Sequence, residues 1–114
     1  MSGGRLPPRL EVPALIRRAE TQGGFATVLH RGDPESGAVL LLVTSRGRHF
    51  GGLERVLGAG GGYQWRTVGP AESAESAEVA AFLAKRRQFD PDLWAVELDI
   101  ADPERFIAET TAAG

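Results

Sequence analysis

Apolar residues recur along this chain at two spacings, every three to four residues in some segments and every second residue in others. The first spacing runs from Val12 to Ala19 on one helical face, and the glycine pair at 23–24 predicts the end of that helix. The same spacing returns over residues 71–88. A capping carboxylate at Asp102, followed by proline, predicts the start of a short final helix. The pattern therefore predicts two main helices and a third, shorter one.

Five further segments have the composition of strands. Residues 93–100 alternate cleanly, with Glu97 and Asp99 on the face opposite to the apolar side chains. Residues 38–44 are apolar without alternation, as expected of a central strand that is covered on both faces. The other predicted strands are 25–31, in which Phe25, Thr27 and Leu29 share a face, 49–57 and 63–68.

The predicted order is therefore α-β-β-β-β-α-β-α, which indicates an α+β fold. A meander of hairpin-linked strands is the economical arrangement of these elements. We expect an antiparallel sheet of four to five strands with the two main helices on one face. Residues 9–114 are expected to form this single domain, after a flexible N-terminal lead at residues 1–8.

Composition adds mainly exclusions. The chain has 114 residues, of which 42% are hydrophobic and 25% charged, as is usual for one globular domain. It has no cysteine, which excludes a disulfide scaffold, a thiolate metal site and a cysteine nucleophile. The N-terminal residues lack the apolar core of a secretory signal, and the longest apolar run, 38–43, is too short to span a bilayer. We therefore expect a cytoplasmic protein without a membrane partner.

Charge is distributed unevenly although the net charge is only −2. Residues 1–66 hold nine arginines and five acidic residues, a balance of +4, whereas residues 67–114 hold four basic and ten acidic residues, a balance of −6. Such a division has two possible outcomes. It produces one basic face, or the two halves interleave in the fold and their charges cancel. The acidic total argues against nucleic-acid binding as the main role.

Known chemical motifs are not completed in this sequence. The glycine run 58–62 lacks the Lys-Ser or Lys-Thr pair and the following helix of a phosphate loop, so it predicts a hairpin tip. His30 and His49 match no metal-ligand spacing, and neither Ser36 nor Ser45 has the context of a nucleophile. The sequence predicts no metal site, no cofactor and no catalytic residue.

The densest group of functional side chains lies in the segment 85–94. Asp90 and Asp92 flank a proline next to Arg86 and Arg87, and aromatic residues stand on both sides. In one interpretation this is a binding corner for an acidic or phosphorylated partner. In the other, Asp90 caps a turn after a helix, and Phe89 and Trp94 are core anchors on either side; this structural interpretation is the favoured one.

Arg17 and Arg18 lie on the first predicted helix, away from its apolar stripe. A solvated helix face is the ordinary explanation for such a pair. They would join the cluster around Arg86 and Arg87 if the two main helices were side by side. These four arginines, with Asp90 and Asp92, are the candidate binding residues.

Five segments of the chain form a pattern of their own: residues 14–19 (ALIRRA), 23–29 (GGFATVL), 31–33 (RGD), 37–40 (GAVL) and 89–97 (FDPDLWAVE). Together they resemble a known family of small alphaproteobacterial proteins of unknown function, DUF1491. The resemblance extends from about residue 9 to residue 107 and implies a short bacterial cytosolic protein, with no activity, cofactor or catalytic residue to transfer.

Three functions remain open. The first is a non-catalytic protein-interaction or regulatory module of a bacterial cytosolic complex, whose partner is a protein. The second is a nucleic-acid-binding module in which Tyr63 and Trp65 stack on bases and arginines meet phosphates. The third is a small enzyme that uses Asp90 or Asp92 as acid or base. The sequence leaves the oligomeric state open.

Overall fold

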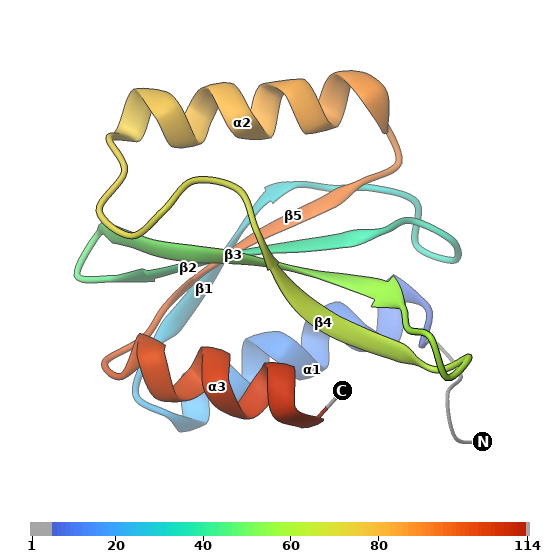
Figure 1. The fold of residues 1–114 in the computed structure, drawn as a ribbon, viewed down its shortest axis with the longest axis horizontal. Helices are drawn as coiled ribbons and strands as arrows, with labels where there is room; N and C mark the ends of the chain where they lie inside the picture. Colours follow the sequence, from blue (N-terminus) through green and yellow to red (C-terminus); the bar gives the residue numbers. More distant parts are fainter. Residues whose placement is uncertain (1–5, 114) are drawn as a thin grey trace.

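The computed structural model describes residues 6–113 and contains the eight elements in the predicted order (Figure 1). The α+β class and the element order are therefore confirmed. Residues 1–5 of the predicted N-terminal lead lie outside the described residues, and Pro8 is already the first residue of a helix. The elements are α1 (Pro8–Thr21), β1 (Phe25–His30), β2 (Val39–Ser45), β3 (Arg48–Leu57), β4 (Tyr63–Val68), α2 (Ser76–Phe89), β5 (Trp94–Asp99) and α3 (Pro103–Ala113).

The five strands form one sheet in the order β1-β5-β2-β3-β4. Three of the four neighbouring pairs are antiparallel, as predicted, but β2 and β5 are parallel. The parallel pair arises because α2 carries the chain from β4 back across the sheet, so that β5 enters between β1 and β2. The last strand of the sequence is therefore a central strand, and the glycine run 58–62 forms the tip of the β3–β4 hairpin, as predicted.

The helices cover both faces of the sheet (Figure 1). Alternate residues of β2, Val39, Leu41 and Val43, pack in a core cluster with α1 and α3, whereas Leu40 and Leu42 belong to a smaller cluster under α2. The prediction that both main helices lie on one face is wrong. A strand that is apolar at every position needs a cover on each side, and α1 and α2 supply one cover each.

A buried ion pair ties α1 to the sheet. Glu11 is only 3% exposed, and its Oε2 lies 2.8 Å from Nη1 of Arg55 on β3. The Arg55 guanidinium also lies 4.9 Å from the centre of the Trp65 ring on β4. Because two desolvated charges depend on each other here, removing either one would leave the other without its main compensation.

The packing of α2 is much thinner than that of α1. None of its residues is buried, and the cluster beneath it contains only Leu40, Leu42 and Leu93 as buried side chains. The helix begins at Ser76, whereas the sequence predicted a start at residue 71. The delay follows from a turn in which Ser73 has a φ of 69° and donates its backbone N–H to the His49 carbonyl oxygen.

No helix within residues 6–113 is long and apolar enough to cross a membrane.

Candidate functional site

The four candidate arginines do not form one surface. Arg17 and Arg18 belong to α1, and Arg86 and Arg87 belong to α2, on the opposite face of the sheet. Two of them have structural partners, because Arg18 lies 4.1 Å from the centre of the Phe106 ring and Arg86 pairs with Glu54 at 2.7 Å. Arg17 and Arg87 are exposed. Their role in binding stays a prediction, but a joint surface of both pairs is excluded.

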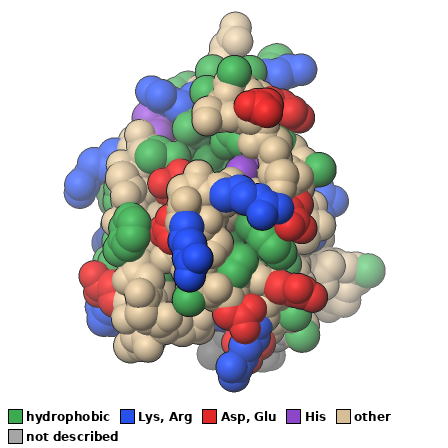
Figure 2. All heavy atoms as spheres, turned by 90° about the vertical axis from the view of Figure 1, so that its left-hand side faces the viewer, with side chains coloured by type: hydrophobic (Ala, Val, Ile, Leu, Met, Phe, Trp, Pro, Cys, Tyr) green, Lys and Arg blue, Asp and Glu red, His purple; other side chains and the backbone are tan. Residues whose placement is uncertain are grey.

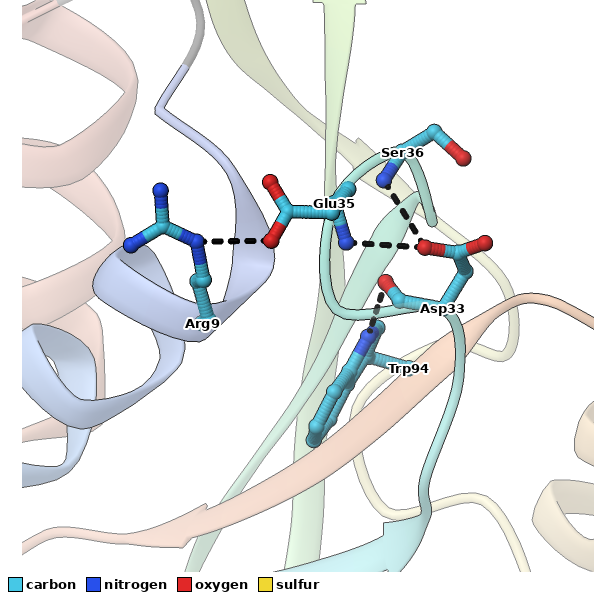
Figure 3. A network of polar contacts seen from close by, with 5 residues as sticks. All are labelled: Arg9, Asp33, Glu35, Ser36 and Trp94. Carbon is cyan, nitrogen blue, oxygen red and sulfur yellow. Dashed lines mark hydrogen bonds and ion pairs between the residues drawn. The ribbon is translucent and has the colours of Figure 1, made fainter.

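The corner at residues 89–94 combines a core residue with an exposed one. Trp94 is 5% exposed, and its Nε1 donates to the Asp33 carbonyl oxygen at 2.8 Å (Figure 3). Phe89 is 78% exposed, so the prediction that it anchors the core is wrong. The α2 stripe ends with Phe82 and Leu83, and the sheet offers no surface to Phe89, which follows them by about two turns of the helix.

The two aspartates of this corner act within the turn. The Asp92 backbone N–H donates to Oδ1 of Asp90 at 3.2 Å, which is the turn-capping contact expected from sequence. The Asp92 carbonyl oxygen accepts from the backbone N–H of Asp33 at 3.0 Å. Neither carboxylate lines the cavity between α2 and the sheet.

The segment 31–37 forms a structural loop around Trp94. Oδ1 of Asp33 accepts the backbone N–H groups of Glu35 at 2.8 Å and Ser36 at 3.2 Å, and these two bonds hold the pKa of Asp33 below its usual value (Figure 3). Glu35 in turn pairs with Arg9 of α1 at 2.7 Å. The arrangement explains the Arg-Gly-Asp pattern of this segment as a packing motif.

The glycines of that loop are required by a close approach of two backbones. A Cβ atom at Gly32 or at Gly37 would overlap the carbonyl oxygen of Asp92. The 31–37 loop and the 89–94 corner are therefore two halves of one packed unit.

The predicted stacking platform for nucleic acid is not accessible. Trp65 is 7% exposed and belongs to the core cluster on the α1 and α3 face of the sheet. Only Tyr63 of the pair is partly exposed. A buried ring does not stack on a base, so this structure does not supply the aromatic face that the nucleic-acid hypothesis needs.

Both histidines bind backbone carbonyl groups in separate places. Nδ1 of His30 lies 2.6 Å from the Leu93 oxygen, and Nε2 of His49 lies 3.1 Å from the Pro70 oxygen. Within the described residues, no three His, Cys, Asp or Glu side chains are grouped as metal ligands would be.

A cavity of about 380 Å³ lies between α2 and the sheet. It exists because α2 packs toward β2, β3 and β4: Arg86 binds Glu54 of β3, and Phe82 contacts Gly69 just after β4. The part of the sheet formed by β5 and β1 is left open beside the helix. Leu29 of β1 and Glu97 of β5 line the cavity from below.

Figure 2 shows the end of the molecule where α2 begins. Basic and acidic side chains are interspersed on this face, and apolar side chains are visible in the recess below the helix. A second hollow of about 390 Å³ lies farther along α2, where His30 of β1 faces Ala84 and Arg87. The two hollows contact successive turns of α2 and successive residues of β1. We call them together the β1–α2 groove.

Strand β1 forms the outer wall of this groove and an edge of the sheet. It exposes three large apolar side chains, Phe25 by 60%, Val28 by 40% and Leu29 by 38%. None of the six residues of β1 is charged or buried. Edge strands are usually protected by charges, proline or a covering element, so β1 is an unprotected edge apart from a register shift between Val28 and His30.

Sequence reasoning missed the β1–α2 groove. The alternation in residues 25–31 indicated that Phe25, Thr27 and Leu29 share a face, but it did not indicate that this face lacks a cover. The narrow apolar stripe of α2, three residues over four turns, was the available signal, because so narrow a stripe cannot cover five strands.

Comparison with known proteins is consistent with this fold. The model of a family described as "Protein of unknown function (DUF1491)" matches residues 6–108. The crystal structure of a DUF1491 family protein from Caulobacter crescentus CB15 is 33% identical, with a TM-score of 0.75 over 90% of this chain and 94% of that chain. An NMR structure of a DUF1491 family protein from the same organism is 34% identical, with a TM-score of 0.72 over 89% and 91%.

A third similar structure is the solution structure of protein Atu0922 from A. tumefaciens. It is 31% identical, with a TM-score of 0.70 over 84% of this chain and 86% of that chain. No curated protein matches the chain at a significant level.

Proposed function

Because this chain belongs to the DUF1491 family, whose description assigns no function, we propose one from its geometry: the protein is a non-catalytic interaction module that binds an extended segment of a partner protein along the edge of β1. The observation that carries the proposal is the apolar, uncharged and unprotected edge strand. We place this interaction in the bacterial cytoplasm, the location expected from sequence.

An edge strand offers a row of unpaired backbone N–H and C=O groups to a further strand. In strand addition, backbone hydrogen bonds provide affinity, and alternate side chains of the added segment enter neighbouring pockets. The β1–α2 groove lies where such side chains would point, because Leu29 lines it and Thr27 lies on the same face. The partner segment therefore needs side chains that offer apolar surface to the groove at every second position.

A photo-crosslinking amino acid at position 27 tests the proposal in living cells. Thr27 is exposed in the middle of β1, so a crosslinker there contacts an added strand. Position 57 at the end of β3 is the matched control, because Leu57 is also an exposed apolar strand residue but lies far from β1 in the sheet order. We expect a defined heterologous product from position 27 and none from position 57.

The product from position 27 should disappear when Phe25→Arg and Leu29→Arg are combined in the same chain, at an unchanged melting temperature. Absence of any product, or the same products from both positions, would refute the proposal. A product consisting of two copies of this chain would also refute it, because it would make β1 a dimer interface.

A further inference from the structure

We infer that the β1–α2 groove selects a basic side chain, lysine or arginine, of the partner segment, and that the Glu97 carboxylate receives its charge. This inference rests on the proposed function only in taking the ligand to be part of a protein.

Glu97 has an unusual position for a carboxylate. It lies on the central strand β5, where it is paired with Thr27 of β1 on one side and with Leu42 of β2 on the other, and it faces α2. It is half-buried. Among the residues that the structure describes, none forms a hydrogen bond or an ion pair with its side chain. A partly desolvated carboxylate without a partner costs free energy, which a cationic ligand would recover.

The two carboxylates near Glu97 on the same face are fully engaged. Glu54 pairs with Arg86 at 2.7 Å and with Arg66 at 3.4 Å. Asp99 accepts the Thr44 hydroxyl at 3.2 Å and two backbone N–H groups of the β2–β3 turn at 2.9 and 3.0 Å. The fold therefore satisfies these two carboxylates of the sheet and leaves Glu97 open toward the cavity.

The walls of the cavity suit the stem of a long basic side chain. Leu29, Leu42, Val79, Ala80 and Leu83 surround the space next to Glu97 with apolar surface. Lysine and arginine bury their methylene stems along such surfaces while the charged head finds a polar group. A cavity of about 380 Å³ is large enough for one such side chain.

The cationic side chain of Arg48 also lines this cavity, and its charge is already compensated. The Arg48 guanidinium lies at the end near the start of α2, where it donates to Oγ of Ser73 at 2.8 Å and pairs with Glu72 at 3.2 Å. The His49 ring binds the Pro70 carbonyl oxygen. The side chain of Glu75, the residue before α2, lies at the same end. An acidic ligand would find no free cation beside Glu97.

The probes for this inference are n-butylammonium and n-propylguanidinium, which reproduce the stems and heads of lysine and arginine. Pentanoate, of similar length and opposite charge, is the matched control. Each is titrated into the ¹⁵N-labelled full chain, and amide chemical shifts are followed by NMR. We expect saturable shifts for the two cations at Thr27, Leu42, Glu97 and Val79, and none of these for pentanoate.

Substitution of Glu97 tests whether its carboxylate recognises the charge of the cationic probe. We expect Glu97→Gln, which keeps the shape of the side chain, to weaken cation binding about tenfold or more. Glu109→Gln, which removes an exposed carboxylate on α3, should leave the titration unchanged. Ala80→Phe, at an exposed position of α2 that lines the cavity, should block the cavity without changing Glu97 and provides a second variant if Glu97→Gln folds poorly.

Equal shifts with pentanoate, or unchanged binding by Glu97→Gln, would overturn the inference. If position 27 crosslinks a partner while the cations fail to bind, the proposed function stands and the selectivity for basic side chains fails. If the cations bind and no partner crosslinks, the proposed function fails and a protein source for the ligand is refuted. The two experiments therefore separate the two statements.

Discussion

Trp94 and Phe89 flank the same turn but have opposite surroundings. The Trp94 ring is enclosed by the 31–37 loop, hydrogen-bonded through Nε1 and approached by the Arg31 guanidinium at 5.5 Å, whereas the Phe89 ring extends from the end of α2 into solvent. At this scale the surroundings of a side chain, and not its chemical type, decide its contribution to stability.

Replacing Trp94 with alanine should lower the free energy of unfolding by about 3–5 kcal/mol, because it removes a buried aromatic ring and its hydrogen bond. Phe89→Ala is the matched control from the same turn and should change stability by less than about 0.5 kcal/mol. Urea denaturation of the two variants measures both values. A loss below about 1 kcal/mol for Trp94→Ala would contradict the structure.

Asp33 should make part of the stability depend on acid. Its lowered pKa means that the folded chain favours the ionised carboxylate. The contribution of Asp33 to the free energy of unfolding is therefore complete at pH values above the pKa of an ordinary aspartate, and it is lost as the pH falls through the lowered pKa of the folded chain. We expect Asp33→Asn to be less stable than the parent chain at neutral pH and to show a smaller loss in melting temperature below about pH 4. Parallel curves of melting temperature against pH would show that the two backbone contacts do not stabilise the charge.

The two long helices have the same length, 14 residues each, but are held very differently. α1 buries Pro8, Glu11, Val12, Leu15 and Ala19, whereas α2 buries no residue. Since most helical stability in proteins comes from packing of one face, α2 is the least stabilised long element of the described fold. The β1–α2 groove is a direct result of this sparse packing.

Hydrogen exchange should resolve this difference. We expect the amides in the middle of α2 to exchange through openings that cost at least about 2 kcal/mol less than those in the middle of α1, because local stability follows the buried contacts of an element. Native-state exchange followed by NMR measures both helices in one sample. Equal protection of the two helices would mean that α2 is held by contacts other than those described above.

At the scale of the whole molecule, the two halves of the sequence interleave. β5, from the acidic half, lies between β1 and β2, from the basic half. Ion pairs also join the halves, for example Arg48 with Glu72 and Arg86 with Glu54. The charge asymmetry of the sequence is therefore largely cancelled by the fold, and the face in Figure 2 carries both signs.

The central position of β5 makes folding depend on the last part of the chain. A fragment of residues 1–92 lacks the strand that joins β1 to β2, so we expect it to have no cooperative thermal transition by circular dichroism. The full chain is the reference. A cooperative transition in the fragment would mean that β1 and β2 pair directly without β5.

Sequence reasoning succeeded where information is local. Periodicity located all eight elements, because the spacing of apolar residues follows from the geometry of a helix or a strand. The alternation in β5 correctly separated buried Val96 and Leu98 from half-buried Glu97. The sequence also predicted the turn at Asp90, because an aspartate before a proline favours a turn through contacts within a few residues.

Features that depend on distant segments were decided only by the tertiary structure. The arginines of α1 and α2 were separated because α2 covers the opposite face, and Phe89 was exposed because α2 extends past the apolar surface of the sheet. Glu97 and Leu29 became neighbours because β5, the last strand in the chain, pairs with β1, the first.

The sequence by itself determined the class of the fold, the order of its elements and the family resemblance, since each is encoded in contiguous residues. The tertiary structure alone decided that β1 lies at an edge of the sheet and that Glu97 faces the cavity without a cation of its own. Those properties arise from the sparse packing of α2 over the sheet, which depends on contacts between segments far apart in the sequence and is therefore not encoded in any local pattern of residues.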